Sequence, residues 1–358
     1  MLIPTHYLEL AARRQAVSRA VGAPVLLAAR PGVEPHDALL KAMGPVAGRA
    51  CGAVWVEGAG VCVYGRSAAD LEAVAAAYGA AVVSGESAGQ LARRLDAVAK
   101  GPGPAGPFGG EVVLITGAAS GIGRACVDAF LERGAAVVGL DINRAIVGLC
   151  DAPAYLGLEC DAADEAAVAD ALGKVAETFG GLDMLVLNAG VFPAGCDIRD
   201  LELAEWRRVM RINLDAGLIM LREAHPLLKL ASQGGRVAVN GSRNVLAPGP
   251  GAAAYSCSKA ALTQLARVAA LEWGQDGIRV NVFHAHGVFD TGIWTDEVLA
   301  ARARHYGKTV EEYKRNNLLK TEVTSRDVAE LAAAMCGPLF AKTTGAQVPI
   351  DGGSDRVV

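Results

Sequence analysis

Between residues 111 and 285, short apolar segments alternate regularly with segments of helical composition. The apolar segments are EVVLITG, AAVVGLD, LDMLVLNAG, GRVAVNGS and IRVNVFHA. Strands that are apolar almost throughout are buried on both faces, and their alternation with helices indicates a parallel sheet between two helical layers. The pattern predicts a doubly wound, Rossmann-type α/β fold. In such a fold, the ligand crevice lies at the carboxyl ends of the strands.

The chain of 358 residues is long enough for a second domain. The segment KGPGPAGPFGG, residues 100–110, is rich in proline and glycine, which is typical of a linker. We therefore predict a small α/β domain over residues 1–100, a linker over 101–110 and the Rossmann-type domain over 111–358. In the first domain, PVLLAA, GAVWVEG and GVCVYG are predicted strands, the last two forming a hairpin through residues 58–60. SAADLEAVAAAYG is a predicted helix.

Composition excludes several classes of protein. No apolar run reaches the roughly 18 residues of a membrane span, and the amino terminus lacks the features of a secretory signal, so we expect a cytoplasmic protein and no membrane partner. The net charge is −4 and no basic stripe is present, so we expect no nucleic-acid partner. The eight cysteines show no metal-ligand spacing, which predicts no metal site.

A glycine-rich turn follows the first of the five strands. TGAASGIGRA, residues 116–125, places Gly117, Gly121 and Gly123 between a strand and a helix, where backbone N–H groups can hold a pyrophosphate. Asp141 ends the next strand, where a carboxylate can accept hydrogen bonds from an adenosine ribose and repel a 2′-phosphate. The pattern favours NAD over NADP. A turn or capping aspartate remains the alternative, and the nearby Arg124 and Arg144 would weaken the choice of NAD.

A serine, a tyrosine and a lysine lie within GSRNVLAPGPGAAAYSCSK, residues 241–259. Tyr255 and Lys259 are four apart in a helical segment, which puts them on one face, about 5–6 Å apart at Cβ. A lysine ammonium and an oxidised nicotinamide ring would both lower the pKa of Tyr255, so that it could serve as base and acid. Ser242 closes a strand, where its hydroxyl could donate to a carbonyl oxygen. The alternative is an ordinary helix pair of core and surface residues.

These motifs, with NAG at 188–190 and RINLDAG around Asn213, resemble the short-chain dehydrogenase/reductase family in order and spacing, over about residues 110–353. The resemblance implies Asn213, Ser242, Tyr255 and Lys259 as a catalytic tetrad. Asn213 would hold a water that links Lys259 to solvent. The cofactor-binding residues that follow from the motifs and this resemblance are Gly117, Ser120, Gly121, Ile122, Gly123, Asp141, Asp161, Ala162, Asn188, Ala189, Gly190, Tyr255, Lys259 and Val288.

A narrower likeness concerns GSRNVLAPGP, GIW at 292–294, NNLLK at 316–320 and KTTGAQVPIDGG. They resemble the dehydrogenase half of bifunctional rhamnulose-1-phosphate aldolase/alcohol dehydrogenases. Residues 1–100 look like a remnant of the end of the class II aldolase half. That aldolase needs a histidine cluster for its metal, whereas this region contains only His6 and His36, so we expect a role in packing or assembly.

The family usually has a Pro-Gly pair after the sixth strand, where this chain reads VNVFHAHGVFDTGIW. We hypothesise that His284 or His286 reaches the crevice, the alternative being two loop histidines. Segment 294–320 lies where a lid would cover a substrate, with Trp294, His305, Tyr306, Lys314, Arg315 and Asn317 as candidate contacts. The substrate contacts that we predict are Arg243, Asn244, His284, His286 and Trp294.

The sequence therefore predicts an NAD(H)-dependent oxidoreductase that interconverts a secondary alcohol and a ketone on a polar, sugar-like or polyhydroxylated small molecule. A variant is a biosynthetic ketoreductase that acts on a cyclic or nucleoside-like ketone. The alternative of another class is a non-catalytic NAD-binding or assembly module. Helical segments 203–230 and 253–273 are apolar enough to form a homodimer or homotetramer.

Overall fold

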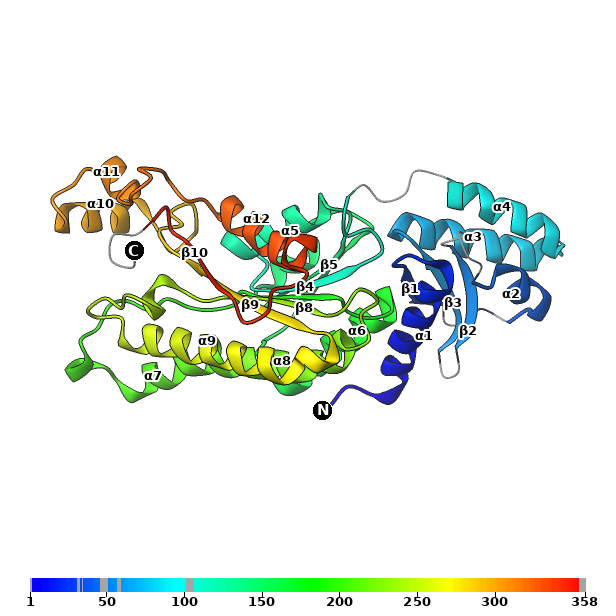
Figure 1. Ribbon diagram of the computed structural model, residues 1–358, viewed down its shortest axis with the longest axis horizontal. Helices are drawn as coiled ribbons and strands as arrows, with labels where there is room; N and C mark the ends of the chain where they lie inside the picture. The colour runs from blue at the N-terminus through cyan, green and yellow to red at the C-terminus, as the bar shows by residue number, and fades with distance from the viewer. Residues whose placement is uncertain are drawn as a thin grey trace.

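The computed structural model describes residues 2–30, 33, 35–45, 51–56, 59–85, 87–100 and 106–353. Half of the predicted linker, residues 101–105, and one end of the predicted hairpin turn lie outside the described residues. Figure 1 shows a central sheet between helices, with the amino-terminal elements at one end of the molecule and α10 and α11 at the other.

The central sheet has seven strands in the order β10-β9-β8-β7-β4-β5-β6, and every neighbouring pair is parallel. The order reverses between β4 and β7, which confirms the predicted doubly wound fold and places the ligand crevice at that point. The strands are β4 (Val112–Thr116), β5 (Ala136–Asp141), β6 (Tyr155–Glu159), β7 (Met184–Leu187), β8 (Arg236–Asn240), β9 (Arg279–Ala285) and β10 (Gln347–Ile350).

Helices cover both faces of this sheet (Figure 1). Successive side chains of a strand point to opposite faces. Val113 and Ile115 of β4 accordingly pack in one core cluster with α5 and α12, whereas Val112 and Leu114 pack in another with α6, α8 and α9. The helices after β4 are α5 (Gly121–Leu131), α6 (Glu165–Phe179), α7 (Leu203–Met210), α8 (Ala216–Leu228), α9 (Ala253–Trp273), α10 (Asp296–His305), α11 (Val310–Lys314) and α12 (Ser325–Cys336).

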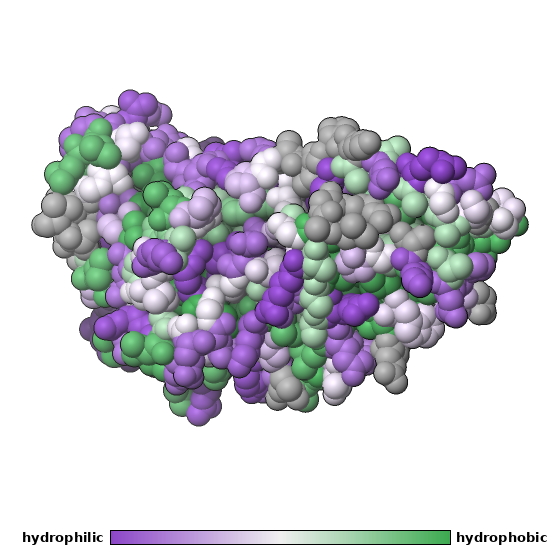
Figure 2. All heavy atoms as spheres, turned by 45° about the vertical axis from the view of Figure 1, so that its right-hand side comes forward, coloured by the Kyte–Doolittle hydropathy of each residue, from purple (hydrophilic) through white to green (hydrophobic). Residues whose placement is uncertain are grey.

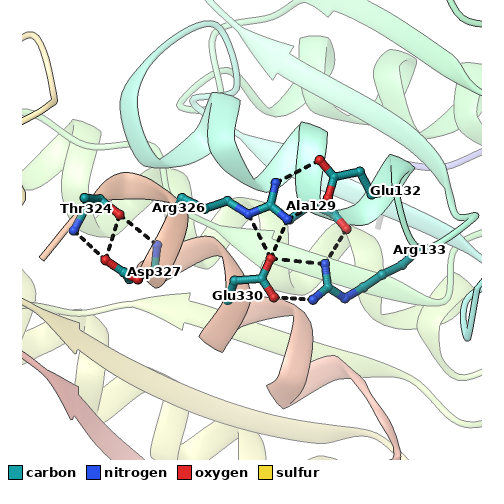
Figure 3. Close-up of polar contacts among 7 residues, drawn as sticks. All are labelled: Ala129, Glu132, Arg133, Thr324, Arg326, Asp327 and Glu330. Atoms are coloured by element: carbon teal, nitrogen blue, oxygen red, sulfur yellow. Dashed lines mark hydrogen bonds and ion pairs between the residues drawn. The ribbon is translucent and has the colours of Figure 1, made fainter.

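Charged residues link α5 to α12 on the outside of one helical layer. Arg326 on α12 forms ion pairs with Glu132, just after α5, and with Glu330, which also pairs with Arg133 (Figure 3). Thr324 and Asp327 form a capping box that begins α12. A single exposed ion pair contributes little stability, but this network joins the end of α5 to α12, which are almost two hundred residues apart in the sequence.

The amino-terminal elements form a small unit with its own antiparallel sheet, in the order β1-β3-β2. Strands β2 and β3 pair from Gly52↔Tyr64 to Val56↔Gly60, in agreement with the predicted hairpin. The unit comprises α1 (Thr5–Val21), β1 (Leu26–Ala29), α2 (Asp37–Met43), β2 (Gly52–Val56), β3 (Gly60–Gly65), α3 (Ala68–Ser84) and α4 (Ala88–Lys100). Helix α3 is the predicted one, and the domain boundary at residue 100 stays a prediction.

A buried ion pair joins this unit to the amino-terminal edge of the parallel sheet. Arg14 of α1 donates to the Asp183 carboxylate at 2.6 Å, and the two side chains are 3% and 0% exposed. The same guanidinium donates to the carbonyls of Val25 and Gly110. Arg14 therefore connects three segments at the edge of the sheet that lies opposite the carboxyl ends of its strands.

Among the described residues, no helix is both long and apolar enough to cross a membrane. On the face seen in Figure 2, hydrophilic and hydrophobic residues are interspersed. In the same part of the chain, no group of three or more His, Cys, Asp or Glu side chains is arranged to hold a metal ion.

Candidate active site

A cavity of about 680 Å³ opens at the carboxyl ends of the central strands. Its walls come from the turns after β4, β5, β7, β8 and β9, the start of α9, and the segment that contains α10 and α11. Of the described residues, none before residue 117 lines it. The amino-terminal unit thus contributes nothing to the cavity wall, and the predicted crevice lies where the fold places it.

The glycine turn forms one wall of the cavity. Gly117 and Gly121 have φ angles of +65° and +54°, which favour glycine, and both line the cavity. Helix α5 begins directly there, its N-cap Ser120 makes no side-chain capping bond, and its first turn carries no acidic residue. The first N–H groups of α5 are thus available to an anion, and a side chain at Gly117 would come within 2.9 Å of Ala189. The wall therefore fits a dinucleotide pyrophosphate.

Gly123 has a different role from the one predicted. It does not line the cavity, and a Cβ on it would lie 2.0 Å from the carbonyl oxygen of Gly117. Glycine is required here because the helix packs directly against the turn. The remaining predicted cofactor residues all line the cavity: Gly117, Ser120, Gly121, Ile122, Asp141, Asp161, Ala162, Asn188, Ala189, Gly190, Tyr255, Lys259 and Val288.

Two carboxylates mark one end of the cavity. Asp141 accepts hydrogen bonds from the N–H groups of Ala119 and Asn143, at 3.0 and 2.9 Å, so it closes the turn while it lines the cavity. Asp161 accepts from Arg211 at 2.9 Å. Burial alone would raise the pKa of Asp161, but hydrogen bonds from the backbone of Ala163 and from Arg211 hold it below its usual value. These carboxylates can accept hydrogen bonds from ribose and adenine groups.

Arginines near Asp141 do not reach this end of the cavity. Arg124 donates to Asp128 and to the carbonyl of Leu149, and neither Arg124 nor Arg144 lines the cavity. Among the described residues, no cation forms an ion pair with Asp141, which matters for the choice between NAD and NADP.

Ser242, Tyr255 and Lys259 converge on the cavity, although they come from the end of β8 and from α9. The Tyr255 hydroxyl is hydrogen-bonded to the Ser242 side chain. Lys259 donates to the carbonyl of Asn240 at 2.8 Å. The Tyr255 ring rests edge-on against Phe192, with ring centroids 4.6 Å apart. This geometry places a proton donor, a hydroxyl partner and a buried ammonium side by side.

Asn213 lies behind this group rather than in the cavity wall. It sits in a π-helical turn, Arg211–Asp215, between α7 and α8. Its side chain exchanges hydrogen bonds with the N–H and C=O of Val191 and donates to Ser258. A Cβ on Gly190 would lie 3.1 Å from its oxygen and 3.4 Å from the Lys259 ammonium. Asn213 therefore fixes the turn after β7 close to Lys259.

The pKa of Tyr255 differs from the sequence-based expectation. Burial raises it, and only the hydrogen bond from Ser242 opposes that rise. Burial also lowers the pKa of Lys259, to about 8. Lys259 is still mostly protonated at neutral pH, but burial outweighs the other influences on the pKa of Tyr255, so the phenol stays protonated in the protein without a cofactor. The expected depression is thus not a property of the protein alone.

The buried Lys259 gives a pH-dependent stability. An unfolded lysine titrates near about 10.4, so from about pH 8 upwards the unfolded chain binds a proton that the folded chain does not. The free energy of unfolding therefore rises with pH in this window. Urea titrations at about pH 8 and 9.5 should show a rise in wild type that exceeds the rise in Lys259→Met by about 1–2 kcal/mol. Equal pH dependence in both proteins would contradict the lowered pKa.

His284 does not contact the cavity, which corrects the expectation that it touches substrate. It is 1% exposed and lies outside the cavity wall, in contact with Ser242. Its Nδ1 accepts the N–H of Ser242 at 3.1 Å, so the proton is on Nε2, which donates to Gln347 at 3.0 Å. Burial lowers the pKa of His284. A neutral histidine therefore orients the backbone that carries Ser242, whereas His286 does line the cavity.

The last wall of the cavity comes from the predicted lid segment. Arg243, Asn244 and Trp294 line the cavity as predicted, and so does Tyr306, which directly follows α10. Four other lid candidates do not line it: His305, Lys314, Arg315 and Asn317. Lys314 instead pairs with Glu322, and Asn317 bonds to the backbone of Thr321.

Sequence reasoning missed several lining residues. Arg302 lies four positions before Tyr306 on α10, so helical spacing would have placed them on one face. Tyr313 of α11 stacks on Tyr306 with ring centroids 5.7 Å apart. Phe192 also lines the cavity and is the second residue after the NAG turn. No sequence signal indicated it.

Comparisons with known proteins identify the family of the chain. A family model described as enoyl-(acyl carrier protein) reductase, one of the short-chain dehydrogenase/reductase models, matches residues 117–355. The uncharacterized oxidoreductase YuxG of Bacillus subtilis is 33% identical over 264 residues, which cover 70% of this chain and 38% of YuxG. The cis-4-hydroxycyclohexanecarboxylate dehydrogenase of Sinomonas cyclohexanicum is 33% identical over 256 residues, covering 70% of this chain and 98% of that protein.

A solved structure shares the fold. The ligand-free aldohexose dehydrogenase of Thermoplasma acidophilum superposes with a TM-score of 0.59 at 24% identity, covering 68% of this chain and 93% of that one. The share of this chain that matches, 68%, is about the share that forms the parallel sheet and its helices.

Proposed function

The chain belongs to the short-chain dehydrogenase/reductase family, an oxidoreductase family that uses NAD or NADP, and we propose that it is an NAD(H)-dependent enzyme that interconverts a secondary alcohol and a ketone on a polar small molecule. The observation that carries the proposal is the convergence of Ser242, Tyr255 and Lys259 on the cavity that the glycine turn also lines. By its name, the Sinomonas relative oxidises a ring hydroxyl, which supports a secondary alcohol.

Ser242, Tyr255 and Lys259 would each have a separate role in the proton transfer. When bound, the nicotinamide accepts or supplies a hydride at the carbon that carries the oxygen. The Ser242 oxygen accepts the N–H of Asn244 at 3.1 Å, which leaves its hydroxyl hydrogen for Tyr255 or for a substrate oxygen. Tyr255 in its phenol form is the acid for ketone reduction, and as a phenolate it is the base for alcohol oxidation. A protonated Lys259 stabilises that phenolate.

The residues that would hold the cofactor fit it along its length. The α5 amino terminus with Gly117 and Gly121 would bind the pyrophosphate, and Asp141 and Asp161 would bind the adenosine half. Lys259 would bind the hydroxyls of the second ribose. His284 keeps Ser242 in place from behind. Phe192 and Val191 would exclude water beside the reacting atoms.

The choice of NAD over NADP rests on Asp141. A 2′-phosphate would lie near this carboxylate without Arg124 to offset the repulsion. We expect wild type to favour NAD by at least about tenfold in kcat/KM, and Asp141→Ser to lower that ratio about tenfold, equivalent to about 1.4 kcal/mol. Asp151→Ser removes an exposed carboxylate that does not line the cavity, and it should leave the ratio unchanged. A preference for NADP in wild type would contradict the assignment.

Turnover decides between this proposal and its alternatives. We expect the protein to reduce NAD with at least one member of a panel of polyols, sugars and hydroxy acids. The absorbance of the reduced nicotinamide measures this turnover. NADH consumption with cyclic ketones alone would favour the ketoreductase variant. Cofactor binding with no turnover on either panel would favour the non-catalytic module.

The oligomeric state of the protein and the role of its amino-terminal unit stay predictions. Leu218 on α8 and Val268 and Leu271 on α9 are exposed apolar side chains, which supports a homodimer or homotetramer through these helices. In the amino-terminal unit, His36 caps α2. A structural use of one of its two histidines supports the proposal that the unit serves packing or assembly rather than aldol chemistry.

A further inference from the structure

Ser242 lies just beyond the last paired position of its strand. Strand β8 pairs with β9 up to Asn240↔Phe283, and the N–H of Gly241 donates to the carbonyl of Phe283 at 2.8 Å. The next N–H, that of Ser242, donates to a side chain instead, reaching Nδ1 of His284 at 3.1 Å. The backbone of the serine is therefore held by an imidazole and not by the ladder of the sheet.

The ring of His284 fits tightly between the serine turn and the neighbouring edge strand. A Cβ on Gly241 would lie 2.5 Å from its Nδ1, so only glycine lets the chain pass so close to the ring. On the other side, Nε2 lies 3.0 Å from Oε1 of Gln347 on β10. The ring satisfies both partners in one tautomer, with the proton on Nε2 and the lone pair of Nδ1 facing the N–H of Ser242.

The Ser242 hydroxyl is fixed by the same turn. Its oxygen accepts the N–H of Asn244 at 3.1 Å, within the short 3-10 turn Arg243–Val245 that Ser242 begins. The hydroxyl is also hydrogen-bonded to Tyr255. Because His284 holds the backbone and Asn244 holds the oxygen, the hydroxyl is directed to Tyr255 at the wall of the cavity.

A proton on Nδ1 of His284 would remove this support. An imidazolium donates from both nitrogens, so the N–H of Ser242 would face another N–H. Ser242 is only 6% exposed, so its N–H would lose its acceptor where water cannot readily replace it. Either the ring or the serine turn must then shift, and the hydroxyl loses its fixed position.

The surroundings of His284 keep the ring neutral. Burial lowers the pKa of His284, the bond to Gln347 opposes this, and the positive charge of Lys259 on α9 lowers it further. The other groups that face the ring are the uncharged Ser242 after β8 and the uncharged Gln347 and Pro349 of β10. Within the described chain, no carboxylate pairs with His284. The neutral ring is thus the main form at neutral pH, and the charged form appears as the pH falls.

We propose that His284 is a positioning residue of the reaction, which holds the Ser242 hydroxyl in its working orientation only while the imidazole is neutral. The proposal rests on the proposed oxidoreductase function and adds a residue that regulates this site by pH. Turnover would then fall reversibly when His284 takes up a proton. Cofactor binding would persist, because the ring does not line the cavity.

The pH dependence of kcat for NADH-linked ketone reduction tests the proposal. Reduction is the informative direction, because Tyr255 acts there as the acid and its protonation does not lower the rate at low pH. Erythrulose and 4-hydroxycyclohexanone serve as probes, since neither carries a charge that titrates in this range. We expect wild-type kcat to fall at low pH with a midpoint below about 6.5, the ordinary pKa of histidine, and to recover when the pH is raised again.

Substitutions at Gln347 and His284 assign this acid midpoint. Gln347→Glu places a carboxylate next to Nε2 at an exposed position, which favours the charged ring, so the midpoint should rise by about 1–2 pH units. Gln264→Glu is the matched control, because Gln264 is exposed on α9 and does not line the cavity, and it should leave the midpoint unchanged. His284→Asn keeps an acceptor near the position of Nδ1 and cannot titrate, so it should retain kcat within about threefold and lose the fall at low pH. His284→Leu should lower kcat at least about tenfold and change the KM for NADH less than about twofold.

His286 lines the cavity and is a second histidine whose charge acts there, so His286→Asn must retain the fall of kcat at low pH. An unchanged midpoint in Gln347→Glu, or a fall that persists in His284→Asn, would overturn the proposal. Magnetic resonance of the NADH-bound protein separates it from the proposed function. With isotope-labelled serine, the amide signal that Ser242→Ala removes should move as the His284 ring titrates. If neither probe is reduced but this signal follows the ring, the oxidoreductase function fails and the coupling of His284 to Ser242 stands. If the probes are reduced and the signal does not move, the function stands and the positioning role fails.

Discussion

Tyr255→Phe is expected to lower kcat of NAD-linked turnover by a factor of about 10²–10⁴, the range for loss of a positioned acid-base group. In the proposed mechanism the phenol is the proton donor next to the reacting oxygen, and its hydroxyl is hydrogen-bonded to Ser242. The phenyl ring keeps its edge-on packing against Phe192, so the cavity keeps its shape. NADH affinity, measured by fluorescence titration, should change little.

Tyr155→Phe is a matched control for this substitution. The Tyr155 hydroxyl donates to the carbonyl of Ile146 and does not line the cavity. Its loss should cost stability of about 1 kcal/mol and leave kcat within about twofold. If Tyr255→Phe retained more than a tenth of wild-type turnover, another group would have to supply the proton.

Arg14→Ala is expected to lower the free energy of unfolding by about 3–5 kcal/mol, because it leaves the buried Asp183 carboxylate without its ion-pair partner. Asp183 is fully buried, one of its carboxylate oxygens has no partner among the described residues, and the other would keep only the N–H of Val112. The carbonyls of Val25 and Gly110 would lose a donor as well. Urea unfolding followed by circular dichroism measures the effect.

The neighbouring Arg13 provides the control, since it is exposed and one residue away on the same helix. Arg13→Ala should change the free energy of unfolding by less than about 0.5 kcal/mol. The double variant Arg14→Met with Asp183→Asn should recover part of the loss, because no unpaired charge remains. Equal stability of Arg14→Ala and wild type would show that the ion pair contributes no net stabilisation.

The alternation of apolar segments with helical segments was enough to predict most of the parallel sheet. The five strands quoted from the sequence are the five inner strands of the sheet, because inner strands are buried on both faces and read as continuous apolar runs. The edge strand β6, YLGLE, is only partly buried and carries no such run. Edge strand β10 contains Pro349, which also weakens the strand signal.

Within the site, short-range motifs were informative and long-range contacts were not. Gly117, Gly121, Ser242 and Tyr255 act at turns or helix starts that a local pattern describes. The role of His284 depends on its pairing with Gln347, sixty-three residues away on the neighbouring strand, which no local pattern encodes. Burial of Lys259 likewise arises from tertiary packing, so its lowered pKa could not be anticipated from a spacing of four.

The two edges of the parallel sheet have separate tasks. The carboxyl edge carries the cavity, whereas Arg14 connects the small antiparallel unit to the amino edge. Any molecule that docks on that unit would leave the route of substrate and cofactor open. Attachment at one edge and exchange of reactants at the other could therefore proceed at the same time, on opposite sides of one rigid sheet.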